Sequence, residues 1–129
     1  MTRINVGISP KELPDKLLLA EHREITRIPN AISSNRAVII GIPKDFKLGQ
    51  GHVKFFYNKI KYLFNRYVSL YEECMARGFK VTDKSSAFDE NKIRSDLWKD
   101  YKELPDDRNI VVQRIESKGF KLLNELRNS

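Results

Sequence analysis

The chain has 129 residues, of which 40% are hydrophobic and 32% are charged, and this suits one compact domain spanning residues 1–129. A net charge of +7 favours a polyanionic partner, although a basic surface can also serve solubility alone. The single cysteine, Cys74, excludes an internal disulfide and a cysteine-cluster zinc site, and its apolar position favours buried packing. No apolar run reaches the roughly 18 residues of a membrane span and no signal peptide is evident, so we expect a cytoplasmic protein.

The start of a first helix is predicted by Ser9, Pro10 and Glu12, which together form a capping signature. Pro14 follows too closely for one uninterrupted helix, because proline has no N–H and clashes in a helix interior. The sequence therefore predicts either a short first turn or a true helix start near Pro14 and Asp15. We expect the helix to run through residues 16–27 and to end or kink at Pro29 and Asn30.

Residues 30–50 form a long connection. Within it, residues 37–42 are rich in β-branched side chains and predict either a short buried strand or the packed end of the connection. Pro43 and the nearby glycines favour an irregular path afterwards.

Two further helices are indicated by apolar spacing. One is predicted by the stripe Phe56, Ile60, Leu63, Tyr67, Leu70 and Cys74, with Gly78 as its C-terminal cap. The other is expected to begin at Asp106 or Asp107 and to run to Leu126, with Gly119 as a weak point. About three helices with long irregular connections and no convincing sheet predict an all-α bundle.

Glu24 is the first candidate for chemistry. It falls in register with Leu13, Leu17 and Ala20, so it lies on or beside an apolar face, where a carboxylate costs free energy unless it is paired. Arg23 and Arg27 are four residues apart and are expected to share a helix face beside it. An ordinary ion-paired surface network is the alternative interpretation.

The N-terminus is the second candidate. The small residue at position 2 favours removal of Met1, which leaves Thr2 with a free α-amine. Such an amine has a pKa of about 7.7–8.0, which a nearby cation such as Arg3 or Arg23 would depress, and its neutral form is a nucleophile toward a sugar carbon. Most processed N-termini have no chemical role, so the signal needs support from elsewhere.

That support comes from a resemblance carried by five blocks of sequence. The opening MTRIN (residues 1–5) and AEHRE (20–24) closely resemble the phage-type pyrimidine-dimer DNA glycosylases, the endonuclease V family. The resemblance continues in FKLGQGHVKFFY (46–57) and EECMARGF (72–79), with a weaker match in QRIESK (113–118).

The resemblance implies a glycosylase with abasic-site lyase activity on ultraviolet-damaged duplex DNA, acting without metal or organic cofactor. We expect a monomer, because no long exposed apolar stripe remains once the three predicted helices pack together. In such enzymes the mature N-terminal amine attacks the sugar carbon bearing the damaged base and forms a Schiff base. By resemblance, Thr2 supplies the amine and Glu24 is the essential carboxylate. The DNA contacts would come from Arg3, His22, Arg23, Arg27, Arg114 and Lys118.

The chain departs from the family's pattern at several positions. His22 replaces a tyrosine, Thr26 a proline and Leu17 a histidine, and the family's aromatic C-terminal cluster is reduced here to Phe120. These departures leave two alternatives open, a duplex-DNA binder that does not cut and an enzyme for a different base lesion.

Three other side chains admit two interpretations each. Trp98 and Tyr101 are expected to pack in the core, with stacking on DNA bases as the alternative. His52, at the start of the second helix, is expected to make a hydrogen bond or packing contact there, and catalysis is the alternative.

Overall fold

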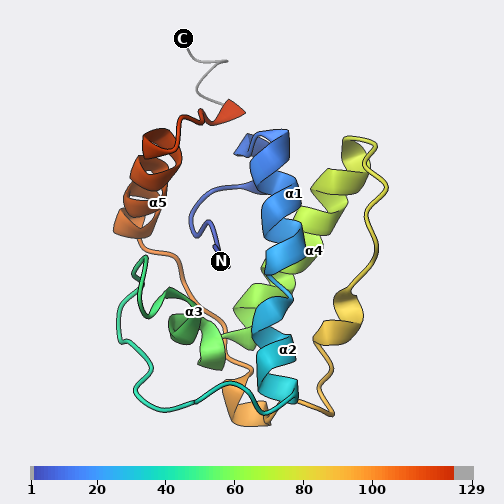
Figure 1. The fold of residues 1–129 in the computed structure, drawn as a ribbon, viewed down its shortest axis with the longest axis vertical. Coiled ribbons are helices and arrows are strands. Elements are labelled where there is room, and N and C mark those ends of the chain that lie inside the picture. Colours follow the sequence, from blue (N-terminus) through green and yellow to red (C-terminus); the bar gives the residue numbers. More distant parts are fainter. Residues whose placement is uncertain (1, 124–129) are drawn as a thin grey trace.

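The computed structural model describes residues 2–123, and the expected all-α fold class is confirmed within them. The α-helices are α1 (Asp15–Glu24), α2 (Arg27–Ser33), α3 (His52–Phe55), α4 (Ile60–Ala76) and α5 (Pro105–Ser117). Short 3₁₀ helices cover Pro10–Glu12, Phe56–Asn58, Ser85–Ala87 and Ser95–Leu97. Figure 1 shows α1 and α2 following one another beside α4, with α5 on the far side of the N-terminal segment, residues 2–9.

The start of the first helix combines both predicted alternatives. A 3₁₀ turn over Pro10–Glu12 is capped by Ser9, whose backbone N–H donates to the Glu12 carboxylate at 3.0 Å. Pro14 then serves as the N-cap of α1. The capping signature therefore marks a short turn, and the helix proper begins after the second proline.

The expected single helix over residues 16–27 is wrong. α1 ends at Glu24, and α2 begins at Arg27 and runs through Pro29 without ending there. Pro29 is the third residue of α2, where a backbone N–H would have no intrahelical acceptor, so proline costs little at this position. The break at Ile25 and Thr26 places Glu24 at a helix end.

Residues 37–42 form no strand. Val38 and Ile40 are 65% and 73% exposed, whereas Ala37 and Ile39 pack against the core. This segment is the packed end of a long connection, the second of the two alternatives.

The helix α4 carries the predicted apolar stripe and ends as expected. Gly78 has a φ of +83°. Its N–H donates to the Met75 carbonyl, and the Phe79 N–H donates to the Cys74 carbonyl, both at 3.0 Å. This paired pattern is a Schellman motif and satisfies carbonyls at the helix end. The helix begins later than predicted, because Phe56–Asn58 forms a 3₁₀ turn. Cys74 is fully buried, as expected.

The helix α5 is shorter than predicted. The Asp107 carboxylate accepts the Leu104 backbone N–H at 2.8 Å, so it caps the helix from within its first turn. The helix ends at Ser117 because Gly119 adopts a φ of +86° and the Phe120 N–H turns back to the Ile115 carbonyl. Leu122 is still buried, and Leu126 lies outside the described residues.

The N-terminal segment is part of the core. Ile4, Val6 and Ile8 are at most 1% exposed, and Figure 1 shows the segment in the middle of the molecule. Its turn at Gly7 is held on both sides. The Gly7 N–H donates to Glu103 at 2.9 Å, and Arg108 donates to the Gly7 carbonyl at 3.0 Å. The first residues of the chain are therefore fixed in place by residues about a hundred positions later.

Replacing Gly7 with alanine should lower the free energy of unfolding by about 2–4 kcal/mol, because two penalties combine. The φ of +83° disfavours any side chain, and a Cβ here would lie 2.9 Å from the Arg108 Cα. Gly49→Ala is the matched control, since Gly49 also has a positive φ, +69°, but a Cβ added there would meet no other part of the protein within 4 Å. Urea denaturation should show the control losing only about 1–2 kcal/mol; equal losses in both variants would contradict the packing argument.

Candidate active site

Two hollows lie on either side of the N-terminal segment. The larger, about 520 Å³, is lined on its polar side by Glu12, Asp100 and Glu103 together with the buried Arg66. The smaller, about 410 Å³, lies between α1 and α5. Acidic walls repel phosphates, so the larger hollow suits DNA poorly. The smaller one is the candidate site.

The candidate pocket joins polar groups from three parts of the chain to an apolar wall. Its charged and polar lining comes from the N-terminal segment, α1 and α5, and comprises Arg3, Asn5, Glu21, Glu24, Arg114 and Lys118. Its apolar lining comprises Leu17, Ala20, Ile115 and Phe120. The predicted register is confirmed for Leu17, Ala20 and Glu24, because all three line the same pocket. Leu13, its first member, instead lies before α1 and is buried in the core.

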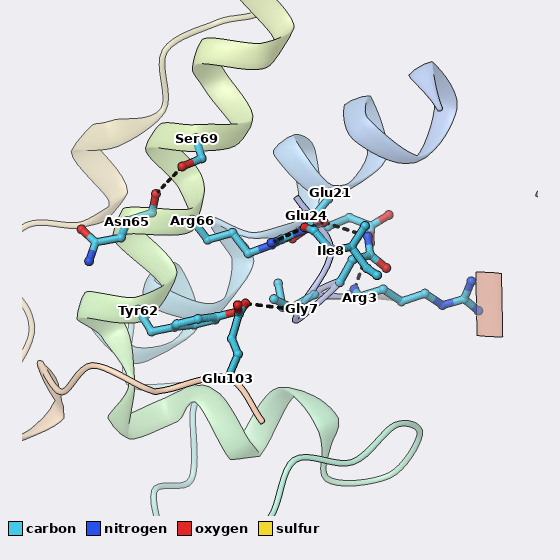
Figure 2. A network of polar contacts seen from close by, with 12 residues as sticks. Arg3, Gly7, Ile8, Glu21, Glu24, Tyr62, Asn65, Arg66, Ser69 and Glu103 are labelled. Carbon is cyan, nitrogen blue, oxygen red and sulfur yellow. Dashed lines mark hydrogen bonds and ion pairs between the residues drawn. The ribbon is translucent and has the colours of Figure 1, made fainter. Parts of the chain in front are cut away.

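Glu24 is attached to the N-terminal segment. Its Oε1 accepts the Arg3 backbone N–H at 3.1 Å, and its Oε2 lies 3.7 Å from the Arg23 guanidinium. The Glu24 side chain is only 14% exposed. Figure 2 shows Glu24 and Glu21 directed toward the N-terminal segment, with the Arg3 side chain extending away from Arg66. A carboxylate is thus held at the chain start in a pocket with several cations.

The bond to Arg3 also places Thr2. Consecutive backbone nitrogens are at most about 3.7 Å apart, so the Thr2 nitrogen lies within about 7 Å of the Glu24 carboxylate. Thr2 itself is partly exposed. The two predicted catalytic residues are therefore neighbours, and one water or one sugar atom can stand between them.

A buried polar network connects the pocket to α4. The Arg66 guanidinium donates to both carboxylate oxygens of Glu21, with Nη2 at 2.9 Å from Oε1, and also to the Ile8 carbonyl. Burial is the largest single influence on the pKa of Arg66 and lowers it, but Glu21, Tyr62 and Glu103 together raise that pKa above its ordinary value. On its other side Glu21 accepts from Asn5, which in turn accepts from Arg114.

His52 fixes the other flank of the N-terminal segment. Its Nε2 accepts the Ile4 backbone N–H at 2.9 Å, and its Nδ1 lies 2.8 Å from the Lys47 carbonyl, to which it donates. Both nitrogens are used, which requires the neutral ring with its proton on Nδ1. The expected role in hydrogen bonding and packing is confirmed, but its partner is the chain start.

Acidification should loosen this attachment and lower stability. Burial is the main cause that lowers the pKa of both His52 and His22 below the ordinary value. The unfolded chain then binds more protons, so the stabilisation is present above about pH 6.5 and is lost as pH falls through the folded pKa.

Urea midpoints measured between pH 7.5 and 5.5 should therefore fall with pH. The decrease should be smaller in His52→Gln, which cannot titrate. If the midpoint fell by the same amount in both His52→Gln and His22→Phe as in the parent protein, these two histidines would not be the cause of the pH dependence.

His22 is not at the pocket, which corrects its expected role as a DNA contact. It is 3% exposed, and its ring stacks on Tyr67 at a centroid distance of 5.3 Å, with Tyr71 at 6.1 Å. The α1 residues that face α4 are buried whatever their polarity, and His22 is one of them. Its Nε2 is one of two buried side-chain nitrogens without a hydrogen-bond partner among residues 2–123.

The remaining predicted DNA contacts differ in exposure. Arg23, Arg27 and Lys118 are exposed, whereas Arg114 is partly buried in the pocket. Trp98 and Tyr101 pack against the core, as expected. Tyr101 also donates from its hydroxyl to Asp107. The basic residues that line the pocket, Arg3, Arg114 and Lys118, therefore come from the N-terminal segment and from α5 with its C-cap.

Sequence reasoning missed three residues that build the site: Asn5, Glu21 and Arg66, which form the buried network. It recognised His52 but not the residue that His52 contacts. A signal existed for Glu21, which lies beside Leu17 and Leu18 in helical spacing and so points inward despite its charge. Nothing in the spacing connects Asn5 or Arg66 with it, because those contacts are long-range.

Among the described residues, no group of His, Cys, Asp or Glu side chains is arranged to hold a metal ion. No helix within residues 2–123 is long and apolar enough to cross a membrane.

A family model described as pyrimidine dimer DNA glycosylase matches residues 1–86. The matched region contains the N-terminal segment and all of α1 to α4, including Thr2, Glu24 and His52. It does not contain α5, so Arg114 and Lys118 are connected with the site by geometry.

Proposed function

Because the chain belongs to the pyrimidine dimer DNA glycosylase family, we propose that it releases a damaged pyrimidine from duplex DNA and then cuts the strand, with the Thr2 amine as nucleophile. The observation that carries this proposal is the hydrogen bond from the Arg3 N–H to Glu24. It holds the start of the chain beside a carboxylate in a basic pocket.

The proposed reaction begins after Met1 has been removed. The lone pair of the Thr2 amine forms a bond to the C1′ carbon of the sugar, and the glycosidic bond breaks with its electron pair leaving on the base, which takes up a proton. Opening of the sugar ring breaks the C1′–O4′ bond, protonates O4′ and leaves an imine, the Schiff base. Loss of a C2′ proton then expels the 3′ phosphate.

Glu24 is suited to two parts of this sequence. Its negative charge stabilises the cationic sugar that develops as the base leaves, and its free lone pairs can accept a proton. A partly buried carboxylate exerts a stronger field than an exposed one, because less water screens it. Arg23, Arg27 and Lys118 are exposed, which supports a role for them in contacting phosphates. Phosphate contacts would position the duplex without reading its sequence.

Of the departures from the family's pattern, two are buried away from the pocket and two line it. His22 and Thr26 are buried at 3% and 4% exposure, so they alter packing inside the fold. Leu17 lines the pocket and faces the same cavity as Phe120. A preference for a lesion other than the pyrimidine dimer would therefore arise from the Leu17 side of the pocket.

Borohydride trapping on duplex DNA tests the proposal. Protein confirmed to begin at Thr2 is incubated with ultraviolet-irradiated duplex and, separately, with duplex containing an abasic site. A covalent adduct mapped to the Thr2 amine on irradiated DNA is the expected result. The matched control carries one extra residue before Thr2 and should give no adduct at that nitrogen.

The other outcomes distinguish the alternatives. An adduct on abasic DNA alone would support the lyase step and assign the enzyme to a different lesion. Tight, salt-dependent binding with no adduct on either duplex would overturn the proposed chemistry in favour of a DNA-binding protein that does not cut.

A further inference from the structure

Asn5 uses both ends of its carboxamide inside the protein. Its Nδ2 donates to Glu21 Oε1 at 2.7 Å, and its Oδ1 accepts from the Arg114 guanidinium. Only this orientation works, because the flipped amide would set oxygen against carboxylate and NH₂ against guanidinium. Asn5 is 5% exposed, so water cannot readily replace either bond.

The anchor behind Asn5 is rigid. The side chains of Glu21 and Arg66 are 1% and 7% exposed, and they share two hydrogen bonds. Arg66 also donates to the Ile8 carbonyl at 2.9 Å, which fixes it to the N-terminal segment. The network therefore runs from α4 through α1 and Asn5 to Arg114 on α5.

Arg114 is held in a place that its charge disfavours. Burial, and then the neighbouring charge of Arg3, lower its pKa, while Glu21 and Glu24 act in the opposite direction. Two guanidiniums lining one pocket repel each other unless they are restrained or an anion binds between them. Asn5 supplies a neutral restraint, which orients Arg114 without cancelling its charge. A carboxylate at the same position would form an ion pair and remove the attraction for an anion.

We propose that Asn5 is a positioning residue that holds the Arg114 guanidinium in the pocket, oriented for a DNA phosphate next to the damaged nucleotide. The inference rests on the proposed function only in that the pocket receives DNA. It involves no step of the chemistry, so it can be tested on a duplex that cannot react.

The test is a double-mutant cycle on DNA affinity. Asn5→Ala, Arg114→Ala and the double variant are titrated with a duplex containing a tetrahydrofuran abasic-site analogue. Each single variant should bind about tenfold more weakly, and the double variant no more weakly than Arg114→Ala alone. Asn65→Ala, an exposed asparagine on α4, is the matched control and should bind like the parent protein.

The salt dependence gives a readout that a structural defect would not change. Losing one phosphate contact reduces the slope of log affinity against log salt by about one. Arg114→Ala and Asn5→Ala should both show that reduction. Asn5→Ser, which keeps a small polar group but removes the carboxamide oxygen, should show it as well, and provides a folded variant if Asn5→Ala does not fold.

The inference would be overturned if the two single losses in affinity multiplied in the double variant. It would also be overturned if the salt slope were unchanged in Asn5→Ala and Asn5→Ser. Failure of the parent protein to bind the duplex would overturn it together with the proposed function. Binding with the expected cycle but no borohydride adduct would leave the role of Asn5 standing and remove only the chemistry.

Discussion

Replacing Glu24 with glutamine should reduce base release by about 10³-fold or more, while affinity for the duplex changes little. Glutamine has the same shape, and its side-chain oxygen can still accept the Arg3 N–H that the carboxylate accepts at 3.1 Å. Only the negative charge and the capacity to take a proton are lost. The change therefore separates the chemistry of Glu24 from its role in holding the N-terminal segment.

Single-turnover assays of base release, alongside binding titrations, would measure both quantities. Glu72→Gln is the matched control, because Glu72 is exposed on α4. Glu24→Ala should lose affinity as well, since the Arg3 N–H then has no acceptor there. Unchanged turnover in Glu24→Gln would contradict the catalytic assignment of this carboxylate.

Replacing Arg66 with methionine should lower the free energy of unfolding by about 3–5 kcal/mol. Methionine fills much of the arginine volume, but it leaves Glu21 as a charge that is 1% exposed and without its guanidinium partner. Domains of this size are stable by about 5–15 kcal/mol, so the loss would be a large share of the total.

Urea denaturation of Arg94→Met provides the comparison. Arg94 pairs with Asp96 at 3.2 Å, but both side chains are about two-thirds exposed, at 66% and 65%. An exposed pair of this kind contributes at most about 1 kcal/mol. Similar losses in the two variants would mean that burial does not determine the cost of breaking these ion pairs.

Local signals in the sequence predicted the parts of the fold that depend on neighbouring residues. The apolar stripe of α4 and its glycine cap were both predictable, because spacing and cap lie within one helix. The end of α5 was not predictable, because the apolar stripe continues to Leu122, past Gly119. The helix ends where it does because Gly119 adopts a positive φ, which the apolar spacing does not reveal. Pro29 misled for a similar reason, since its effect depends on where the helix begins.

In the candidate site, too, local features were predictable and long-range contacts were not. The register of Glu24 with Leu17 and Ala20 follows from helical spacing alone. The contacts of Asn5 and His52 do not, because each joins residues that are far apart in the chain. His22 was misplaced because a resemblance indicates which position varies but not which side of the helix that position faces.

The central placement of the N-terminal segment has a consequence for how the molecule is made. Asn5 is joined to Arg114 and Gly7 to Arg108, so during synthesis each of these two residues emerges long before its partner, which lies 109 or 101 positions later. Contacts over such separations slow folding relative to a bundle of locally paired helices. A ribosome-bound chain stalled before α5 would contain both proposed catalytic residues, Thr2 and Glu24. It would still lack an assembled pocket, because the residues of α5 that line it would be missing.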